Sequence, residues 1–372
     1  MSEQRPSPGR PRVAVLFGGR SAEHGVSCLT AGSVLRAIDR ERYDVVPIGI
    51  SHSGQWVLEA DSDDRLALTD GALPEVDEKA TPVVLTNTEL VVTDAADVPR
   101  VLGEVDVVFP LLHGPFGEDG TVQGLFEMAG VRYVGAGVLA SAIGMDKHYM
   151  KLIFQAAGLP VTPYTVVTPR AWRQDRGAVM EAVAALGYPV FVKPSRAGSS
   201  FGISKVHDES EFDAAVALAQ EHDPKVIVEA FADGAREIEC GVLQGFGDDP
   251  PEASVVAEIK VGGEHEFYDF EAKYLPEEAT ELDVPADIGD KVSERLRDLA
   301  VRAFTAIGAE GLARVDFFVL PNGDAVINEI NTMPGFTPTS MFPRMWAAAG
   351  VDYPELVDRL LTLAMQRPIG LR

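Results

Sequence analysis

Two carboxylates near the C-terminus stand where strand geometry would place them face to face. Asp316 and Glu329 lie in apolar runs on either side of Asn322-Gly323. An Asn-Gly pair between two β-type runs is the strongest short signal for a hairpin, because both central residues must adopt positive φ. With these two residues as the loop, Asp316 is predicted to face Glu329 and Arg314 to face Asn331.

The predicted hairpin face is suited to a divalent cation. Strand side chains alternate, so one face carries Arg314, Asp316, Phe318, Ile327, Glu329 and Asn331. Opposed carboxylates destabilise a ladder unless a cation offsets their charge. Asn331 adds a third oxygen, and hard oxygen donors suit Mg²⁺ or Mn²⁺. The alternative is a solvent-exposed hairpin face with scattered charges, which the long apolar runs and the arginine disfavour.

A phosphate-binding segment is indicated around Lys193, which ends an apolar strand predicted over 188–193. The Gly/Ser-rich segment 194–202 that follows offers backbone N–H groups and hydroxyls, which can wrap phosphates. The motif G-x-x-x-x-G-K-[ST] does not occur in the chain, so this is not a Walker-type loop. The alternative is a Gly/Ser hairpin turn with a lysine at a sheet edge.

Two further acids lie near the ends of predicted strands. Glu229 is near the end of the strand predicted over 225–231, where it could accept a hydrogen bond from an exocyclic amine. Glu237 begins the strand predicted over 237–243, and it could bind ribose hydroxyls. Taken alone, each acid is more often a solvated residue at a strand end.

The N-terminal segment begins like a dinucleotide-binding fold, with an apolar strand over 12–17, the turn Gly18-Gly19 and a helix over 31–38. The spacing G-x-G-x-x-G is not met, and Glu23 near the helix start would repel a pyrophosphate. The sequence therefore argues against NAD. It favours an ammonium-bearing ligand beside Glu23, with a capping carboxylate as the alternative.

The remaining pattern predicts an α/β half followed by a mixed α+β half. Strands over 43–50 and 105–112 and a helix over 121–128 imply one doubly wound domain with a parallel sheet up to about residue 140. The loop 113–120 follows a strand at the carboxyl edge, where such sheets bind ligands. Downstream we expect helices over 140–157, 209–221, 287–307, 342–349 and 353–366, antiparallel strands over 188–193, 203–206, 225–231 and 237–243, and a long functional loop over 260–283.

Composition excludes several classes of protein. The net charge of -25 argues against nucleic-acid and anionic-membrane surfaces. No apolar run reaches the roughly 20 residues of a membrane helix, and residues 1–11 are expected to form a disordered leader without a signal core. Cys28 and Cys240 are too few for a disulfide framework, which favours a reducing cytoplasm and buried structural thiols.

Taken together, the motifs resemble those of the D-alanine–D-alanine ligases of the ATP-grasp superfamily, over nearly the whole chain from about Val13. The matching segments, in order, are Gly18-Gly19-Arg20-Ser21-Ala22-Glu23, Leu112-His113-Gly114, Gly117-Glu118-Asp119-Gly120, Met145-Asp146-Lys147, Val192-Lys193-Pro194, Gly198-Ser199-Ser200, Glu271-Ala272-Lys273-Tyr274, Ala313-Arg314-Val315-Asp316 and Asn328-Glu329-Ile330-Asn331-Thr332-Met333-Pro334-Gly335. A further segment departs from the family pattern: Asp233-Gly234-Ala235-Arg236-Glu237 is one residue longer than the usual Gly-Arg-Glu spacing.

The resemblance implies ATP-dependent joining of two D-alanines through an acyl phosphate, with release of ADP and phosphate, for peptidoglycan precursors. It implies two Mg²⁺ ions, replaceable by Mn²⁺, held by Asp316, Glu329 and Asn331. The residues it implies for ATP are Lys147, Phe191, Lys193, Ser199, Ser200, Glu229, Phe231, Ala232, Glu237, Phe267, Lys273, Phe318, Asn328 and Glu329.

For the amino acids, the resemblance implies binding by Glu23, Val26, His113, Arg314, Gly335, Ser340 and Met341. Catalysis falls to Glu23, Ser199, Tyr274, Arg314 and Gly335, with Arg314 and the Gly335 N–H stabilising an oxyanion. Tyr274 lies on the long loop, which becomes a lid that excludes water. Depsipeptide-forming relatives typically replace this tyrosine by Phe or differ in the loop.

The expected organisation is a leader over 1–11, an N-terminal pre-ATP-grasp domain over 12–142, a central subdomain over 143–234 and a C-terminal subdomain over 235–372 that carries the lid loop 260–283. The resemblance also implies a cytoplasmic homodimer. The rival functions are a D-alanine–D-lactate ligase and a catalytically silent nucleotide-binding protein. Arg314 and the oxygen triad argue against a silent protein, because a mere binder needs neither.

Overall fold

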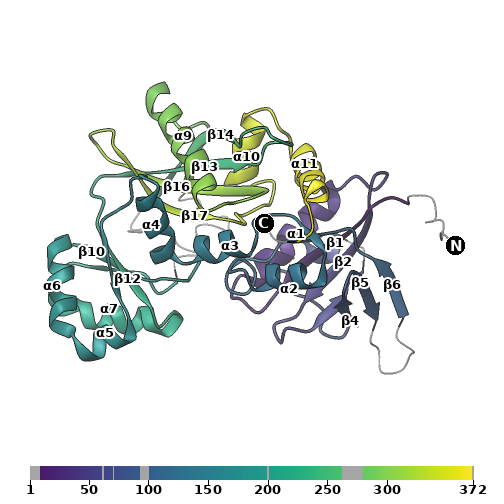
Figure 1. Ribbon diagram of the computed structural model, residues 1–372, viewed down its shortest axis with the longest axis horizontal. Helices are drawn as coiled ribbons and strands as arrows, with labels where there is room; N and C mark the ends of the chain where they lie inside the picture. Colours follow the sequence, from purple (N-terminus) through teal and green to yellow (C-terminus); the bar gives the residue numbers. More distant parts are fainter. Residues whose placement is uncertain are drawn as a thin grey trace.

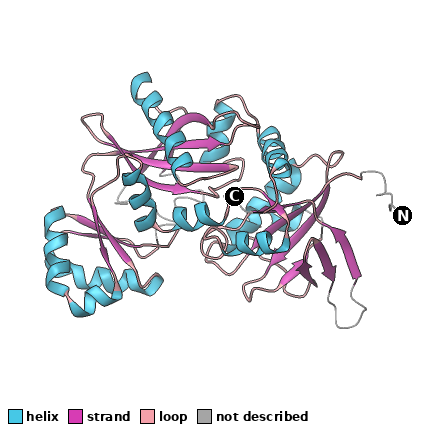
Figure 2. Ribbon diagram, viewed as in Figure 1, coloured by secondary structure: helices cyan, strands magenta, loops and turns pink. Residues whose placement is uncertain are grey.

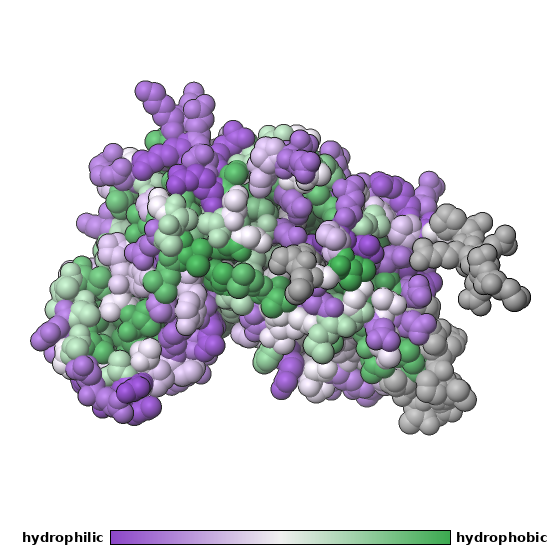
Figure 3. All heavy atoms as spheres, in the orientation of Figure 1, coloured by the Kyte–Doolittle hydropathy of each residue, from purple (hydrophilic) through white to green (hydrophobic). Residues whose placement is uncertain are grey.

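Three β-sheets, each backed by helices, make up the structure, a computed structural model that describes residues 9–60, 63–69, 71–92, 100–198, 201–261 and 280–370. Figure 1 shows the sheets side by side, with α3 Val138–Met145 and α4 Lys147–Ala156 between them. Figure 2 shows that the helices lie mostly on the outside of the sheets. In Figure 3, apolar residues gather over α3 and α4, where the parts of the protein built on the three sheets meet.

The N-terminal sheet has eight strands in the order β6-β5-β4-β3-β2-β1-β7-β8. Its parallel part consists of β1 Arg12–Gly18, β2 Asp44–Ile50, β7 Val107–Pro110 and β8 Arg132–Tyr133. An antiparallel extension, which the sequence did not resolve, adds β3 Trp56–Leu58, β4 Thr81–Thr86, β5 Glu89–Val92 and β6 Arg100–Glu104; the turn η1 Asp63–Leu66 lies between β3 and β4.

Both faces of the parallel part are covered, as the uninterrupted apolar run of β1 predicts. Val13, Val15 and Phe17 pack in the core that α1 His24–Ala37 and α11 Tyr353–Gln366 share. Ala14 and Leu16 point to the other face, where α2 Thr121–Ala129 packs. The C-terminal helix therefore returns to cover the first sheet, and the doubly wound arrangement is confirmed for this part.

The central sheet has four antiparallel strands in the order β11-β10-β12-β9. These are β9 Tyr164–Val167, β10 Val190–Pro194, β11 Ser204–Val206 and β12 Val226–Ala230. The helices α5 Pro169–Gln174, α6 Arg176–Leu186 and α7 Glu209–His222 accompany it. The strands β10, β11 and β12 and the helix α7 agree with the sequence prediction, whereas β9, α5 and α6 were not predicted.

The third sheet has five antiparallel strands in the order β15-β14-β13-β16-β17. These are β13 Arg236–Leu243, β14 Glu252–Val261, β15 Thr280–Asp283, β16 Leu312–Val319 and β17 Ala325–Asn331. On one face α9 Asp290–Ala306 packs against Cys240, Val315 and Phe317. Near β14, α10 Met341–Ala348 packs against Ala257 and Ile259.

The helix predicted over 140–157 is two helices. Asp146 has an extended backbone, with φ -95° and ψ 99°, and therefore ends α3. Its side chain then accepts hydrogen bonds from the backbone N–H groups of His148 and Tyr149, so it is the N-cap of α4. The break lies between Met145 and Lys147, both of which line the cavity described below.

The predicted hairpin between β16 and β17 is confirmed, but its loop was wrong. Leu320 N–H donates to Asp324 O at 2.7 Å, and Gly323 has φ 84°, so the loop is Pro321-Asn322-Gly323. Pairs next to the loop are consequently displaced by one residue from the prediction. A β-bulge at Asn328 restores the register.

Beyond the bulge the predicted pairs hold, with Asp316 opposite Glu329 and Arg314 opposite Asn331. The bulge also corrects the predicted face. Ile327 is fully buried in the core, whereas Asn328 and Glu329 both line the cavity described below. An inserted residue allows two consecutive side chains to lie on the same side of the strand.

Candidate active site

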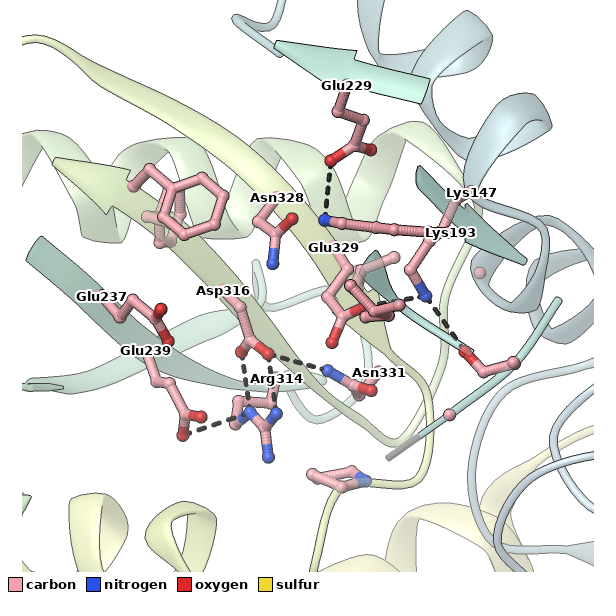
Figure 4. Close-up of a pocket in the computed structure, with 18 of the residues that line it drawn as sticks. Lys147, Lys193, Glu229, Glu237, Glu239, Arg314, Asp316, Asn328, Glu329 and Asn331 are labelled. Atoms are coloured by element: carbon pink, nitrogen blue, oxygen red, sulfur yellow. Dashed lines mark hydrogen bonds and ion pairs between the residues drawn. The ribbon is translucent and has the colours of Figure 1, made fainter. Parts of the chain in front are cut away.

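A cavity of about 390 Å³ lies where the four-stranded and five-stranded sheets meet the loops of the N-terminal sheet (Figure 4). It brings together most of the residues singled out from the sequence. Those that line it are Glu23, His113, Lys147, Phe191, Lys193, Glu229, Phe231, Ala232, Glu237, Arg314, Asp316, Phe318, Asn328, Glu329, Asn331 and Gly335. These residues come from distant parts of the sequence, and elements of all three sheets are needed to bring them together.

Charged side chains form a row across three neighbouring strands. Glu239 on β13 is opposite Asp316 on β16, which in turn is opposite Glu329 on β17. Arg314 donates to both oxygens of Asp316 at 2.7 Å, and its Nε lies 3.2 Å from Glu239 Oε2. Lys147 Nζ lies 2.9 Å from Glu329 Oε2. Figure 4 shows these groups converging on the cavity.

Two side-chain cations, Arg314 and Lys147, therefore offset the repulsion between the opposed carboxylates. From the sequence, a metal ion was expected to do this. The acids Asp316 and Glu239 hold the pKa of Arg314 well above its usual value, although burial acts in the opposite direction. In the same way Glu329 raises the pKa of Lys147 against the effect of burial. Both cations remain charged at neutral pH.

The donor atoms at this face fit a hard divalent cation. Asn331 uses its Nδ2 to donate to Asp316 Oδ2 at 3.1 Å, which leaves its amide oxygen as a donor atom for a metal. Within the described ranges, no three His, Cys, Asp or Glu side chains gather as a metal site of their own. A metal here would thus use Asp316, Glu329, the Asn331 amide and oxygens of a bound ligand.

The opposite end of the cavity carries a buried acid between two lysines. Glu229 on β12 is 2% exposed; its Oε2 lies 2.8 Å from Lys193 Nζ and its Oε1 3.1 Å from Lys151 Nζ. Burial would raise the pKa of Glu229, but the two ammonium groups overcome this effect and lower it to about 2. The carboxylate is therefore fully ionised.

Aromatic rings lie beside this acid. Phe191 on β10 and Phe231, just after β12, have ring centroids 5.8 Å apart. Phe318 lies on β16 opposite Glu237, so both line the same cavity from adjacent strands. Apolar rings next to a buried hydrogen-bond acceptor form a slot suited to a flat heterocycle that bears an amino group.

A third group of residues lies on the side of the N-terminal sheet. His113 is buried: its Nδ1 lies 3.2 Å from Met333 O, and its Nε2 has no hydrogen-bond partner among the described residues. Burial lowers the pKa of His113, so the ring is neutral. Glu118 accepts from the N–H groups of Gly114 and Met333 at 2.7 and 3.2 Å. Burial and the neighbouring Glu23 raise the pKa of Glu118 to about 8.

Three predicted residues do not line the cavity. Val26 is buried within α1, where it is 1% exposed. Ser340 is the N-cap residue of α10 and its Oγ accepts from Thr337 N–H at 3.2 Å. Met341 packs in the small core beside β14. Five others, Ser199, Ser200, Phe267, Lys273 and Tyr274, lie outside the described residues.

No role was predicted for Lys151, Glu118 or Glu239. Lys151 contacts Glu229, and Glu118 and Glu239 line the cavity. Lys151 is four residues after Lys147 and therefore on the same helix face. Glu239 is two residues after Glu237 and thus on the same strand face. These spacings could have identified both residues. Glu118 could be found only through the resemblance, because its motif occupies a loop.

A nucleotide-sized cavity lies between two antiparallel sheets backed by helices, and lysines and a carboxylate–arginine face line it. This arrangement is that of the ATP-grasp fold. A family model described as "D-ala D-ala ligase N-terminus" matches residues 12–136, and "D-ala D-ala ligase C-terminus" matches residues 153–362. The chain belongs to the D-alanine–D-alanine ligase family.

Curated relatives and solved structures agree with this assignment. The chain is 59% identical to the D-alanine–D-alanine ligase of Arthrobacter sp. (strain FB24), over 99% of this chain and 97% of that protein. It is 58% identical to that of Kineococcus radiotolerans, over 98% and 100%. Among solved structures, VanG D-Ala:D-Ser ligase from Enterococcus faecalis matches with a TM-score of 0.82 at 37% identity, over 96% of this chain and 100% of that one. The D-alanine–D-alanine ligase from Coxiella burnetii matches with 0.78 at 33%, over 96% and 94%.

Proposed function

We propose that this protein joins two D-alanines to D-alanyl-D-alanine at the expense of ATP, for the synthesis of cell wall precursors. The observation that carries the proposal is the convergence, in one cavity, of Lys147 and Lys193, the carboxylate face of Asp316 and Glu329, and Glu23 on the far wall. Such a ligation needs cations that bind phosphate, oxygen atoms that bind a metal and an acid that binds an ammonium group.

The reaction has two steps. The carboxylate of the first D-alanine attacks the γ-phosphorus of ATP, which gives an acyl phosphate and ADP. The amine of the second D-alanine then attacks the acyl carbon, loses a proton, and inorganic phosphate leaves. Positioning and electrostatic stabilisation supply most of the acceleration in such phosphoryl transfer.

At the nucleotide, Lys147 and Lys193 contact the phosphates, and Asp316, Glu329 and Asn331 hold Mg²⁺ or Mn²⁺. The divalent metal, when bound, neutralises phosphate charge. Glu229 accepts from the 6-amino group of adenine between Phe191, Phe231 and Phe318, with Ala232 and Asn328 alongside, and Glu237 binds the ribose. The lining of the cavity supports these roles.

At the amino acids, Glu23 pairs with the ammonium of the first D-alanine and His113 contacts its carboxylate. The neutral, buried His113 has one ring nitrogen without a partner among the described residues, which supports this role. Arg314 and the Gly335 N–H stabilise the oxyanion. Val26, Ser340 and Met341 stay assigned to substrate only through the resemblance. The same holds for the proposed roles of Ser199, Ser200, Phe267, Lys273 and Tyr274, which lie outside the described residues.

The second substrate is proposed to be D-alanine. The curated relatives at 59% and 58% identity over the whole chain are named D-alanine–D-alanine ligases, which favours D-alanine over D-serine or D-lactate.

We further propose the segments 12–142, 143–234 and 235–372 as the three units of the fold, and a cytoplasmic homodimer. Among the described residues no helix is both long and apolar enough to cross a membrane. Support for the dimer comes from two large apolar residues, Met128 on α2 and Leu139 on α3, which are 90% and 70% exposed. Light scattering of the purified protein would test the dimer.

The test of the function is an assay with ATP, Mg²⁺ and D-alanine in which products are separated and identified. We expect ADP, phosphate and D-alanyl-D-alanine, and little product when D-serine or D-lactate competes with D-alanine. AMP and pyrophosphate, or no turnover, would refute the proposal. Glu329→Ala should abolish turnover, while Glu221→Ala, on the exposed surface, should not change it. An active Glu329→Ala variant would remove this residue from the metal site.

A further inference from the structure

Lys151 places a positive charge in the interior without a role in the reaction described above. Its side chain on α4 is 0% exposed, and its Nζ lies 3.1 Å from Glu229 Oε1. Transfer of an ammonium group from water into an interior is costly unless an acid accompanies it. Burial accordingly lowers the pKa of Lys151. The acidic partner of Lys151 therefore indicates what the buried charge does.

That partner, Glu229, is shared by two lysines of different accessibility. Lys193 Nζ lies 2.8 Å from Oε2, so each carboxylate oxygen has its own ammonium group. Lys193 lines the cavity and Lys151 does not. A phosphate group in the cavity can therefore attract Lys193 away from Glu229, whereas Lys151 remains in place beneath the carboxylate.

The helix that carries Lys151 also fixes the two ends of the cavity relative to each other. Lys147 and Lys151 are separated by four residues and lie on one face of α4. Lys147 reaches Glu329 on the five-stranded sheet at 2.9 Å, and Lys151 reaches Glu229 on the four-stranded sheet. One helix thereby connects the proposed metal face to the proposed adenine slot.

We propose that Lys151 is a positioning residue that keeps Glu229 ionised and oriented when Lys193 turns to phosphate, and so makes the slot prefer a 6-amino purine to a 6-oxo purine. The inference rests on the proposed function, in which Glu229 meets adenine. An ionised carboxylate only accepts hydrogen bonds, so it accepts from an amino group and repels a carbonyl oxygen. Without Lys151, the departure of Lys193 would leave the buried carboxylate without either of the ammonium groups that contact it, which favours its protonation.

The experiment compares ATP with ITP, which differs in carrying a 6-oxo group, in Lys151→Met. Methionine fills a similar space without the charge. We expect the KM for ATP to rise about tenfold or more, as for the loss of one charge-assisted hydrogen bond. The ratio of kcat/KM for ATP to that for ITP should fall by a similar factor, while kcat at saturating ATP changes less. Leu152→Met, at the exposed neighbouring position on α4, should change none of these values.

A double variant separates the nucleotide effect from a folding defect. In Lys151→Met with Glu229→Gln, no buried acid is left without a cation, so the protein should fold at least as well as Lys151→Met. Its preference for ATP over ITP should equal that of Glu229→Gln alone, because the lysine acts only through the acid. A further loss of preference in the double variant would overturn the proposal, as would a Lys151→Met variant with the wild-type KM and preference.

Calorimetric titration with MgATP and MgITP keeps this inference distinct from the ligation reaction. A wild-type protein that binds ATP but forms no dipeptide would refute the proposed function. The same titrations on Lys151→Met would still decide whether Lys151 determines the preference for the base. An unchanged ratio of the two binding constants would refute the inference even if dipeptide synthesis is normal.

Discussion

The carboxylate of Asp146 connects α4 to two segments of the central sheet, so its removal should cost more than the loss of a helix cap. It accepts from His148 N–H and Tyr149 N–H at 3.1 and 3.3 Å and from Ser195 Oγ at 2.9 Å. Its other oxygen pairs with the Lys225 ammonium. In addition, Lys147 N–H donates to Ser195 O at 2.9 Å. Ser195 therefore also holds the backbone of Lys147, the proposed phosphate-binding lysine.

The cost of Asp146→Ala can be summed from these contacts. Loss of the cap costs about 1 kcal/mol. The Ser195 hydroxyl, which is 0% exposed, would lose its acceptor at a cost of about 1 kcal/mol. The Lys225 side chain is 17% exposed, so its lost pairing is partly screened and adds about 1 kcal/mol. The total is about 3 kcal/mol.

A matched control exists at the start of α11. Asp352 is exposed and caps that helix by accepting from Glu355 N–H at 2.9 Å. Its replacement by alanine should cost only about 1 kcal/mol. Urea unfolding of both variants gives the comparison, and hydrogen exchange shows whether the first amides of α4 open faster in Asp146→Ala. If Asp146→Ala loses no more stability than Asp352→Ala, the connecting role is wrong.

Two further predictions concern buried acids around the cavity. The pKa of Glu118 is raised to about 8, against about 4.3 for an unfolded chain, so between these values only the folded protein keeps the proton. The free energy of unfolding should therefore fall as pH rises from about 5 to 8 and then level off. Urea unfolding of Glu118→Gln should show a smaller fall over this range, because glutamine does not titrate. If the difference in free energy between the two proteins is the same at every pH, the pKa of Glu118 is not raised. Glu239→Gln should lower stability by about 1–2 kcal/mol, because it removes one charge beside Arg314 but keeps an acceptor at 3.2 Å. An unchanged urea midpoint would argue against that ion pair.

Elements with strong local patterns could be predicted from the sequence. The apolar run of β1 was identified as a buried parallel strand and β2 as a second strand, and helices were predicted close to the positions of α9, α10 and α11. The break at Asp146 was missed, because apolar spacing continues across it and the cap forms only with the observed backbone angles. The short α5 and α6 have weaker patterns and were not recognised.

The site was predicted in part because many of its residues occupy recognisable motifs. Physical pattern alone indicated Asp316, Glu329 and Asn331 as a possible metal site. It could not indicate that Lys147 offsets the charge of Glu329, since 182 positions separate them and only the packing of α4 brings them to 2.9 Å. The spacing from Lys147 places Lys151 on the same helix face, but the sequence could not indicate its partner Glu229, which is 78 positions away on β12. Val26, Ser340 and Met341 were assigned by resemblance alone, and they lie away from the cavity wall.

The bulge at Asn328 has a consequence for how this hairpin can vary among relatives. Leu320 pairs with Asp324 across the loop, and from that pair to the pair of Asp316 with Glu329 β17 contains one residue more than β16. The bulge is therefore required whatever the length of the loop between Leu320 and Asp324. Insertions and deletions in the exposed loop should leave Asp316 opposite Glu329, whereas an insertion or deletion within either strand would change the residues that face each other beside the reacting groups.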